Sequence, residues 1–119
     1  MNEKIKSFRD LNIWKKGIEI VEDVYKTTES FSKSELYGLT SQMRRSAVSI
    51  PSNIAEGFTR KHSKEYRQFL YIAMGSCAEL ETHIEIAQRL QYLDARLKED
   101  LLEKINHTTR MIMSLLKLL

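Results

Sequence analysis

The chain has 119 residues, of which 42% are hydrophobic and 29% charged, with one proline and four glycines. This composition predicts one helical domain over residues 1–119 and argues against an all-β fold, which needs frequent Gly and Pro turns. The formal net charge is +3, and no apolar run reaches the ~18 residues that a membrane span needs. With no signal segment and a single cysteine, Cys77, we expect a cytoplasmic protein in a reducing compartment.

A first helix is predicted from about Asp10 to Thr27, with Asp10 or Ser7 as its N-cap. Two apolar stripes run along it and cover about half of its circumference, more than one core contact needs. The stripes are Leu11, Trp14, Ile18, Val21 and Tyr25, and Ile13, Gly17, Ile20 and Val24.

The second helix is expected to begin at a capping box formed by Ser32 and Glu35. It should run to about Glu56, with Gly57 as the C-cap. Pro51 lies inside it, and we expect a kink there rather than two helices, because the apolar spacing keeps its phase across the proline. The predicted core stripe is Leu36, Leu39, Met43, Ala47, Ile50 and Ile54.

Two more helices follow, the third capped by Ser63 and the fourth capped near Asp94. Four amphipathic helices with short links predict an all-α, up-down-up-down antiparallel four-helix bundle, with its second helix kinked near Pro51. Helices 1, 2 and 3 each carry a second apolar or small-residue face. Spare surface of this kind indicates a partner, and a second copy of the chain is the simplest one.

The second face of the second helix carries small or hydrogen-bonding side chains. Its residues are Gly38, Gln42, Arg45, Ser49, Asn53 and Glu56. One interpretation is a row that faces a ligand or RNA. The favoured one is a hydrogen-bonded contact with another helix or subunit, with Arg45 buried and paired to Glu56 or Glu79. Loss of a partner would then leave a buried charge, at a cost of roughly 3–5 kcal/mol.

Basic residues gather in the first 70 residues, which hold 13 Lys or Arg against 9 Asp or Glu. The densest cluster is Arg60, Lys61, His62, Lys64 and Arg67, and a second group is Lys4, Lys6, Arg9, Lys15 and Lys16. Such groups can contact several phosphates of a nucleic acid, with strong salt dependence. The alternative is an ordinary solvated loop and helix start.

An enzyme is not expected. Ferritin-like di-iron bundles use Glu-x-x-His pairs that point inward, whereas Glu79–His83 and Glu103–His107 are one residue further apart and the second pair faces away from the core stripe. Cys77 lies on a core stripe, which favours an inert thiol. No Gly-rich phosphate loop is present. We therefore expect no catalytic residue, metal or cofactor.

Several segments resemble a known family. They are Phe8–Gly17, Val24–Thr28, Glu35–Arg45, Ser49–Gly57 and Phe69–Ser76. They resemble the small bacterial four helix bundle proteins, first named as 23S rRNA intervening-sequence proteins, which are distantly similar to the accessory variability determinant protein of diversity-generating retroelements. The resemblance implies a four-helix bundle in a homopentameric ring with no known enzymatic activity. It also implies that the retroelement relative binds nucleic acid and a reverse transcriptase through a basic surface.

Together these observations predict a non-enzymatic, oligomeric helical bundle. We expect an RNA- or nucleic-acid-associated accessory factor that uses basic patches. The alternative is a protein-binding scaffold with no nucleic-acid role. The expected partners are other copies of the chain, structured RNA or another nucleic acid, and a further protein, with no membrane.

Overall fold

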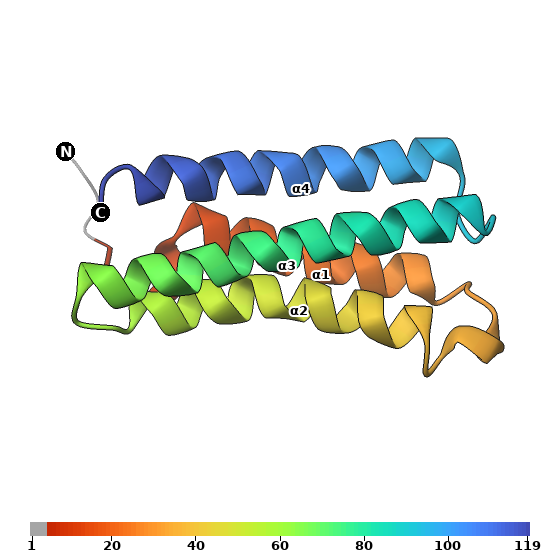
Figure 1. Cartoon of the computed structure of the whole chain (residues 1–119), viewed down its shortest axis with the longest axis horizontal. Coiled ribbons are helices and arrows are strands. Elements are labelled where there is room, and N and C mark those ends of the chain that lie inside the picture. The colour runs from red at the N-terminus through yellow and green to blue at the C-terminus, as the bar shows by residue number, and fades with distance from the viewer. Residues whose placement is uncertain (1–4) are drawn as a thin grey trace.

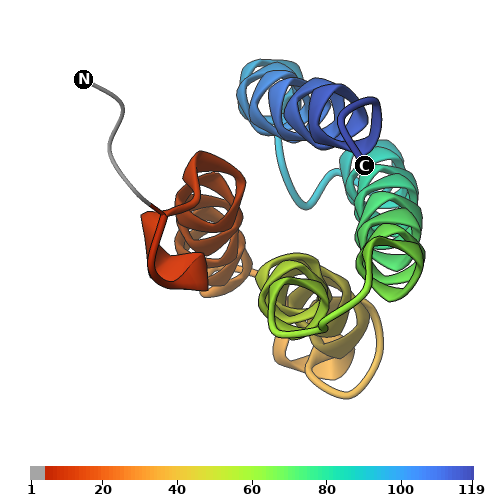
Figure 2. The ribbon, with the colours of Figure 1, turned by 90° about the vertical axis from the view of Figure 1, so that its left-hand side faces the viewer.

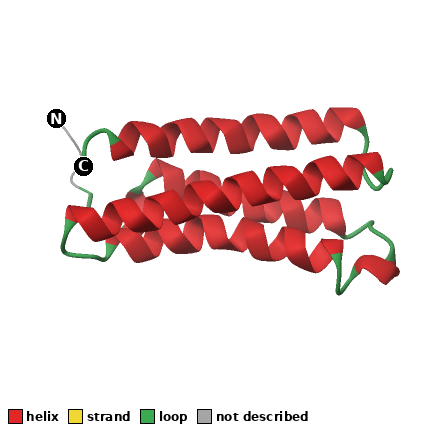
Figure 3. Ribbon diagram, viewed as in Figure 1, coloured by secondary structure: helices red, strands yellow, loops and turns green. Residues whose placement is uncertain are grey.

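The computed structural model describes residues 5–119 and confirms the all-α, four-helix fold. The long helices are α1 (Asn12–Thr28), α2 (Leu39–Phe58), α3 (Ser63–Arg89) and α4 (Ala95–Leu116). Two short 3₁₀ turns, η1 (Phe8–Asp10) and η2 (Lys33–Glu35), precede α1 and α2. In Figures 1 and 3 each helix returns alongside the one before it, and the described residues contain no strand. None of these helices is long and apolar enough to cross a membrane.

The four helices form a closed cycle of contacts, α1–α2–α3–α4–α1, seen end-on in Figure 2. The α2–α3 contact is the most extensive of the four, and the α4–α1 contact is the least extensive. Fully buried side chains from every helix fill the interior, as helical 3–4 spacing requires. They include Ile20 and Val24 of α1, Met43, Ile50 and Ile54 of α2, Leu70, Leu80 and Ile84 of α3, and Ile105 and Ile112 of α4.

Helix α1 begins later than predicted, because a short turn intervenes. Ser7 caps η1, where its hydroxyl accepts a hydrogen bond from the Arg9 amide at 3.1 Å. The Asp10 carboxylate accepts from the amides of Lys6 and Ser7, and these two backbone hydrogen bonds lower the pKa of Asp10. The capping pattern therefore belongs to η1, and α1 starts at Asn12 without a side-chain cap.

The predicted start of the second helix at Ser32 is wrong. Ser32 caps η2, and α2 begins at Leu39, whose amide donates to Glu35 Oε1 at 3.1 Å. The other oxygen of Glu35 accepts from the Tyr92 hydroxyl at 3.0 Å. Gly38, with φ −115° and ψ −112°, separates the two elements. Leu36, predicted to be in the core, lies before the helix and is 46% exposed.

Helix α2 continues across Pro51 as one element, so the alternative of two helices is excluded, while the kink stays a prediction. Pro51 is buried against Gly17 of α1, where an added Cβ would lie 3.1 Å from the proline Cβ. Gly57 is not a C-cap, since it lies inside α2, which ends with Thr59 in the cap position. An added Cβ at Gly57 would lie 2.8 Å from Phe69 Cβ, so this glycine permits close packing of α2 on α3.

Of the two N-caps predicted for the last two helices, the one at Ser63 is wrong and the one at Asp94 is confirmed. Ser63 is the first residue of α3, and the N-cap position is held by His62 without a side-chain hydrogen bond. Asp94 caps α4 as predicted, where its carboxylate accepts from the Leu97 amide at 2.8 Å.

Candidate nucleic-acid interface

The fold brings the two basic groups of the sequence to one end of the bundle, which we call the basic end. It is formed by segments 5–16, 56–67 and 113–119. Turn η1 packs against α1 and α2, and Arg67 near the start of α3 is hydrogen-bonded to the Leu116 carbonyl at the end of α4. This end of the bundle is on the left of Figure 1. These segments hold nine Lys or Arg against three Asp or Glu, whereas the rest of the sequence holds ten against thirteen. Lys4 lies outside the described residues.

The link between α2 and α3 presents three of the predicted phosphate-binding side chains to solvent. Lys61, His62 and Lys64 are exposed, and within residues 5–119 they make no side-chain hydrogen bond or ion pair. Arg60 is engaged, because its guanidinium donates to Glu56 at 2.9 Å and lies 4.8 Å above the Phe69 ring. The unpaired positive charges near the link therefore belong to Lys61 and Lys64, with the exposed imidazole of His62 between them.

Arg67 has a structural role that the sequence did not indicate. Its Nη1 donates to the Leu116 carbonyl at 2.7 Å, and its Nη2 donates to the Tyr71 hydroxyl at 3.3 Å. The last carbonyls of a helix lack intrahelical partners and carry partial negative charge. Arg67 thus satisfies the C-terminus of α4, and its donors are directed into the protein rather than toward a phosphate.

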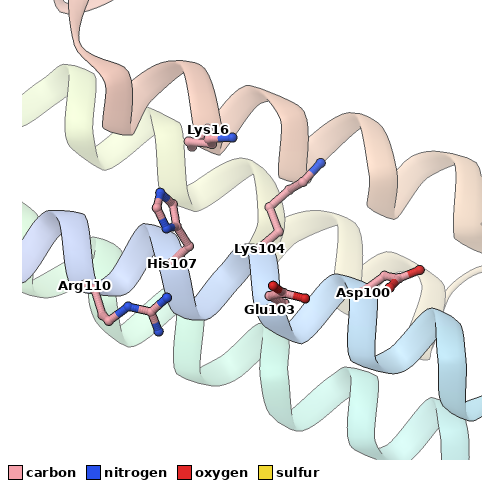
Figure 4. Close-up of a pocket in the computed structure, with 6 residues that line it drawn as sticks. All are labelled: Lys16, Asp100, Glu103, Lys104, His107 and Arg110. Atoms are coloured by element: carbon pink, nitrogen blue, oxygen red, sulfur yellow. The ribbon is translucent and has the colours of Figure 1, made fainter.

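Lys15 and Lys16 lie near the start of α1, and Lys16 borders a groove between α1 and α4 (Figure 4). The groove has a volume of about 360 Å³. It lies between α1 and α4, whose contact is the least extensive of the four helix–helix contacts. Lys16 faces Lys104 and His107 across the groove, with Arg110 beside them. Its lining residues are Lys16, Asp100, Glu103, Lys104, His107 and Arg110.

Two of the groove's cations are already neutralised by α1. Lys104 donates to Asp23 at 2.7 Å and lies 3.5 Å from Glu19, and the bond to Asp23 raises the pKa of Lys104. Lys16 lies 3.7 Å from Glu19. His107 and Arg110 are exposed and make no ion pair within the described chain. Neither residue was predicted as a phosphate contact from the sequence, although their i, i+3 spacing on the polar face of the last helix was a usable signal.

The small polar stripe of α2 lies mainly at the contact with α3. Asn53 donates to Ser49 Oγ at 2.9 Å, and Ser49 Oγ lies 2.8 Å from Ser76 Oγ. Because Ser76 donates its proton to the Ile72 carbonyl, the hydroxyl of Ser49 is the donor between the two serines. This chain of hydrogen bonds joins α2 to α3 and occupies groups that a ligand would need. Gly38 precedes α2, and Glu56 pairs with Arg60 near the link.

Arg45 forms an ion pair with Glu79, one of the two partners predicted from the sequence, and it also donates to Gln42 at 2.8 Å. Within the single chain its side chain is 57% exposed, so burial of Arg45 would need a second subunit and stays a prediction. The stripe reaches the edge of the α2–α3 contact at this position, so the guanidinium keeps its contact with water. Exposed ion pairs contribute about 0–1 kcal/mol, well below the cost expected for a buried charge.

The titratable groups at the core do not form a reactive site. Burial raises the pKa of the Cys77 thiol to about 11, which suppresses the nucleophilic thiolate. His83 Nδ1 lies 3.3 Å from Ser46 Oγ, but Ser46 is completely buried, so no substrate can reach its hydroxyl. Among residues 5–119, no three His, Cys, Asp or Glu side chains gather as metal ligands would.

Comparison with known proteins gives a family and a structural neighbour. Residues 9–114 match the family described as 23S rRNA-intervening sequence protein. The fold is similar to the crystal structure of a protein with unknown function from the S23 ribosomal protein family of Bacteroides thetaiotaomicron, with a TM-score of 0.79 and 21% identity. That match covers 88% of this chain and 98% of the other. No curated protein matches. With most of its length matched, the chain belongs to the 23S rRNA-intervening sequence protein family.

Proposed function

We propose that this protein is a non-enzymatic, RNA-associated binding protein whose basic end contacts the phosphates of structured RNA. The observation that carries the proposal is the meeting of segments 5–16 and 56–67, distant in sequence, at one end of the bundle. Clustered cations on one face are the electrostatic footprint of nucleic-acid binding. The proposed contacts are Lys15, Lys61, His62 and Lys64, continued into the groove by His107 and Arg110, whose side chains make no ion pair within the described chain.

The aromatic residues near this end support recognition of phosphates over stacking on unpaired bases. Phe58 and Tyr66 pack edge to face, with their ring centres 6.1 Å apart, and both are half-buried. Each ring is therefore partly covered by the other, and neither presents a fully free face to solvent. Proteins that bind single strands present aromatic faces to the bases, whereas helical RNA is recognised largely through its shape, phosphates and 2′-hydroxyls.

We also propose that the protein works as a homo-oligomer, in agreement with the pentameric ring that the family resemblance implies. Apolar side chains lie exposed along one face of α3 and at its C-cap, where Ile72, Ile86 and the capping residue Leu90 are 41–55% exposed. Exposed apolar patches on small proteins mark interaction surfaces. Repetition of the basic end in a ring would strengthen RNA binding by avidity without new contacts. Light scattering gives the subunit number, and a monomer at working concentration would contradict this part.

The test compares two double variants with equal loss of charge. Lys61→Gln with Lys64→Gln removes two free cations of the basic end, and Lys26→Gln with Lys33→Gln removes two exposed cations at the other end. Binding of a fluorescent RNA hairpin is measured between about 50 and 200 mM salt. We expect the first variant to bind more weakly, with a salt slope reduced by about 1–2, since each phosphate contact contributes ~0.7–0.9. The second variant should bind like the unaltered protein.

Equal weakening by both variants would show only a net-charge effect and would reject the basic end as the site. If no RNA binds even at low salt, the alternative function, a protein-binding scaffold without a nucleic-acid role, is favoured.

A further inference from the structure

A second pocket lies toward the other end of the bundle, where α1 ends and α2 begins. Its volume is about 480 Å³. The lining residues include two arginines and no Asp or Glu. They are Tyr25, Leu36, Tyr37, Thr40, Ser41, Arg44, Arg45 and Val48. The pocket therefore combines positive charge with apolar walls, and it is separate from both the basic end and the α1–α4 groove.

Arg44 is held in place by residues of α1. Its guanidinium lies 4.5 Å from the centre of the Tyr25 ring, and its Nε donates to Thr28 Oγ1 at 2.9 Å. Thr28 is itself fixed, because its hydroxyl donates to the Val24 carbonyl at 2.8 Å. Within residues 5–119, the two terminal nitrogens of Arg44 make no hydrogen bond. A guanidinium fixed in this way is preorganised to bind a carboxylate through two parallel hydrogen bonds.

The pocket is also bordered by one unsatisfied buried hydroxyl and by exposed apolar side chains. Thr40 Oγ1 is buried and has no hydrogen-bond partner among the described residues, which is rare for a buried hydroxyl. At the rim, Tyr37 is 94% exposed, and Leu36 and Val48 are 46% and 40% exposed. A ligand with one anionic group and flanking apolar groups would pair with Arg44 and cover the rim.

We propose that this pocket docks a short peptide segment of a partner protein, in which one carboxylate side chain lies between apolar side chains. The carboxylate would bind Arg44, and the apolar side chains would pack on Leu36, Tyr37 and Val48. Nucleic acid fits less well, because two of the three exposed rim side chains, Leu36 and Val48, are aliphatic and the chain outside the basic end carries more Asp and Glu than Lys and Arg. The protein would then hold RNA at one end and a protein partner at the other.

The test uses the full chain, labelled with ¹⁵N, and three small probes. The first is acetyl-Leu-Asp-Leu-amide, the second is acetyl-Leu-Asn-Leu-amide, and the third is uridine 5′-monophosphate. We expect the Asp peptide to shift the amide signals of Thr40, Ser41 and Arg44 in a saturable way. The Asn peptide should bind about tenfold more weakly, since it has the same shape but lacks the charge that strengthens the hydrogen bonds.

Two variants locate the binding. Arg44→Lys keeps the charge but loses the paired hydrogen bonds, and it should weaken binding of the Asp peptide about tenfold. Arg96→Lys, on an exposed position of α4 outside the pocket, is the matched control and should leave binding unchanged. Circular dichroism confirms that each variant folds.

Three results would overturn the proposal. Equal binding of the Asp and Asn peptides would show that the carboxylate is not recognised. Tighter binding of uridine monophosphate at the same residues would assign the pocket to nucleotides. Shifts of these signals on dilution alone, with no response to the Asp peptide, would assign the surface to contact between copies of the chain.

Discussion

Two glycines in adjacent helices should respond to alanine with opposite signs. An added Cβ at Gly57 of α2 would lie 2.8 Å from Phe69 Cβ, 3.1 Å from Tyr66 Cδ1 and 3.3 Å from the Tyr66 carbonyl oxygen. An added Cβ at Gly75 of α3 would meet nothing within 4 Å. Both positions are helical, so the difference between them isolates the packing of α2 on α3.

The magnitudes follow from two opposing terms. Alanine stabilises a helix interior by about 1 kcal/mol relative to glycine. At Gly57, the new methyl group must displace the Cβ of Phe69 and part of the α3 backbone, and overpacking of this kind costs about 1–3 kcal/mol. Gly57→Ala should therefore lower the free energy of unfolding by about 1 kcal/mol net, and Gly75→Ala should raise it by about 1 kcal/mol.

Thermal unfolding followed by circular dichroism measures both effects, at one protein concentration because assembly also stabilises. For a chain of this size, 1 kcal/mol moves Tm by about 4 °C. If Gly57→Ala unfolded at the same or a higher temperature than the unaltered protein, close packing of α3 on Gly57 would be refuted. A lower Tm for Gly75→Ala would mean that another subunit packs on this face of α3.

Three further predictions concern titratable side chains. Cys77 should react with a thiol reagent at pH 8 only as fast as the protein opens and should react at once in denaturant, because burial raises its pKa to about 11; rapid labelling of the folded protein would contradict this. In the folded state burial lowers the pKa of His83 below its ordinary value of 6.5, and the nearby Arg45 lowers it further while Glu79 opposes the shift. The free energy of unfolding should therefore decrease as the pH falls below 6.5. The unfolded state then takes up the proton more readily, so His83→Gln should flatten the dependence of Tm on pH between about 7 and 5. Arg45→Ala should cost no more than about 1 kcal/mol in urea unfolding, because the Arg45–Glu79 pair is exposed, and a loss near 3 kcal/mol would show that assembly buries the pair.

The sequence alone determined the four helices and most of the core. Residues at 3–4 spacing lie on one face of a helix whatever the rest of the chain does, so the buried positions of α3, such as Leu70, Leu80 and Ile84, could be predicted from local pattern. The Asp94 cap is also local, because its carboxylate bonds an amide three residues away. Both inferences depend only on neighbours in the chain.

Tertiary structure decided the features whose partners are distant in sequence. The turn η2 interrupts an expected helix at Gly38, where Glu35 caps α2 and bonds to Tyr92, 57 residues away. Arg67 was expected to face phosphates, but it satisfies the Leu116 carbonyl, 49 residues away. A local sequence pattern cannot show which side chains form hydrogen bonds with residues far away in the sequence.

The candidate sites show the same division. The sequence identified Lys61 and Lys64 as a basic cluster, but only the fold places them at the same end as the start of α1 and leaves their charges unpaired. The pocket around Arg44 could not be predicted at all, because it needs the end of α1 to orient a guanidinium of α2. Helical periodicity indicates which face of a helix is apolar. A site depends instead on which faces of different helices meet, and this is decided by how the helices pack.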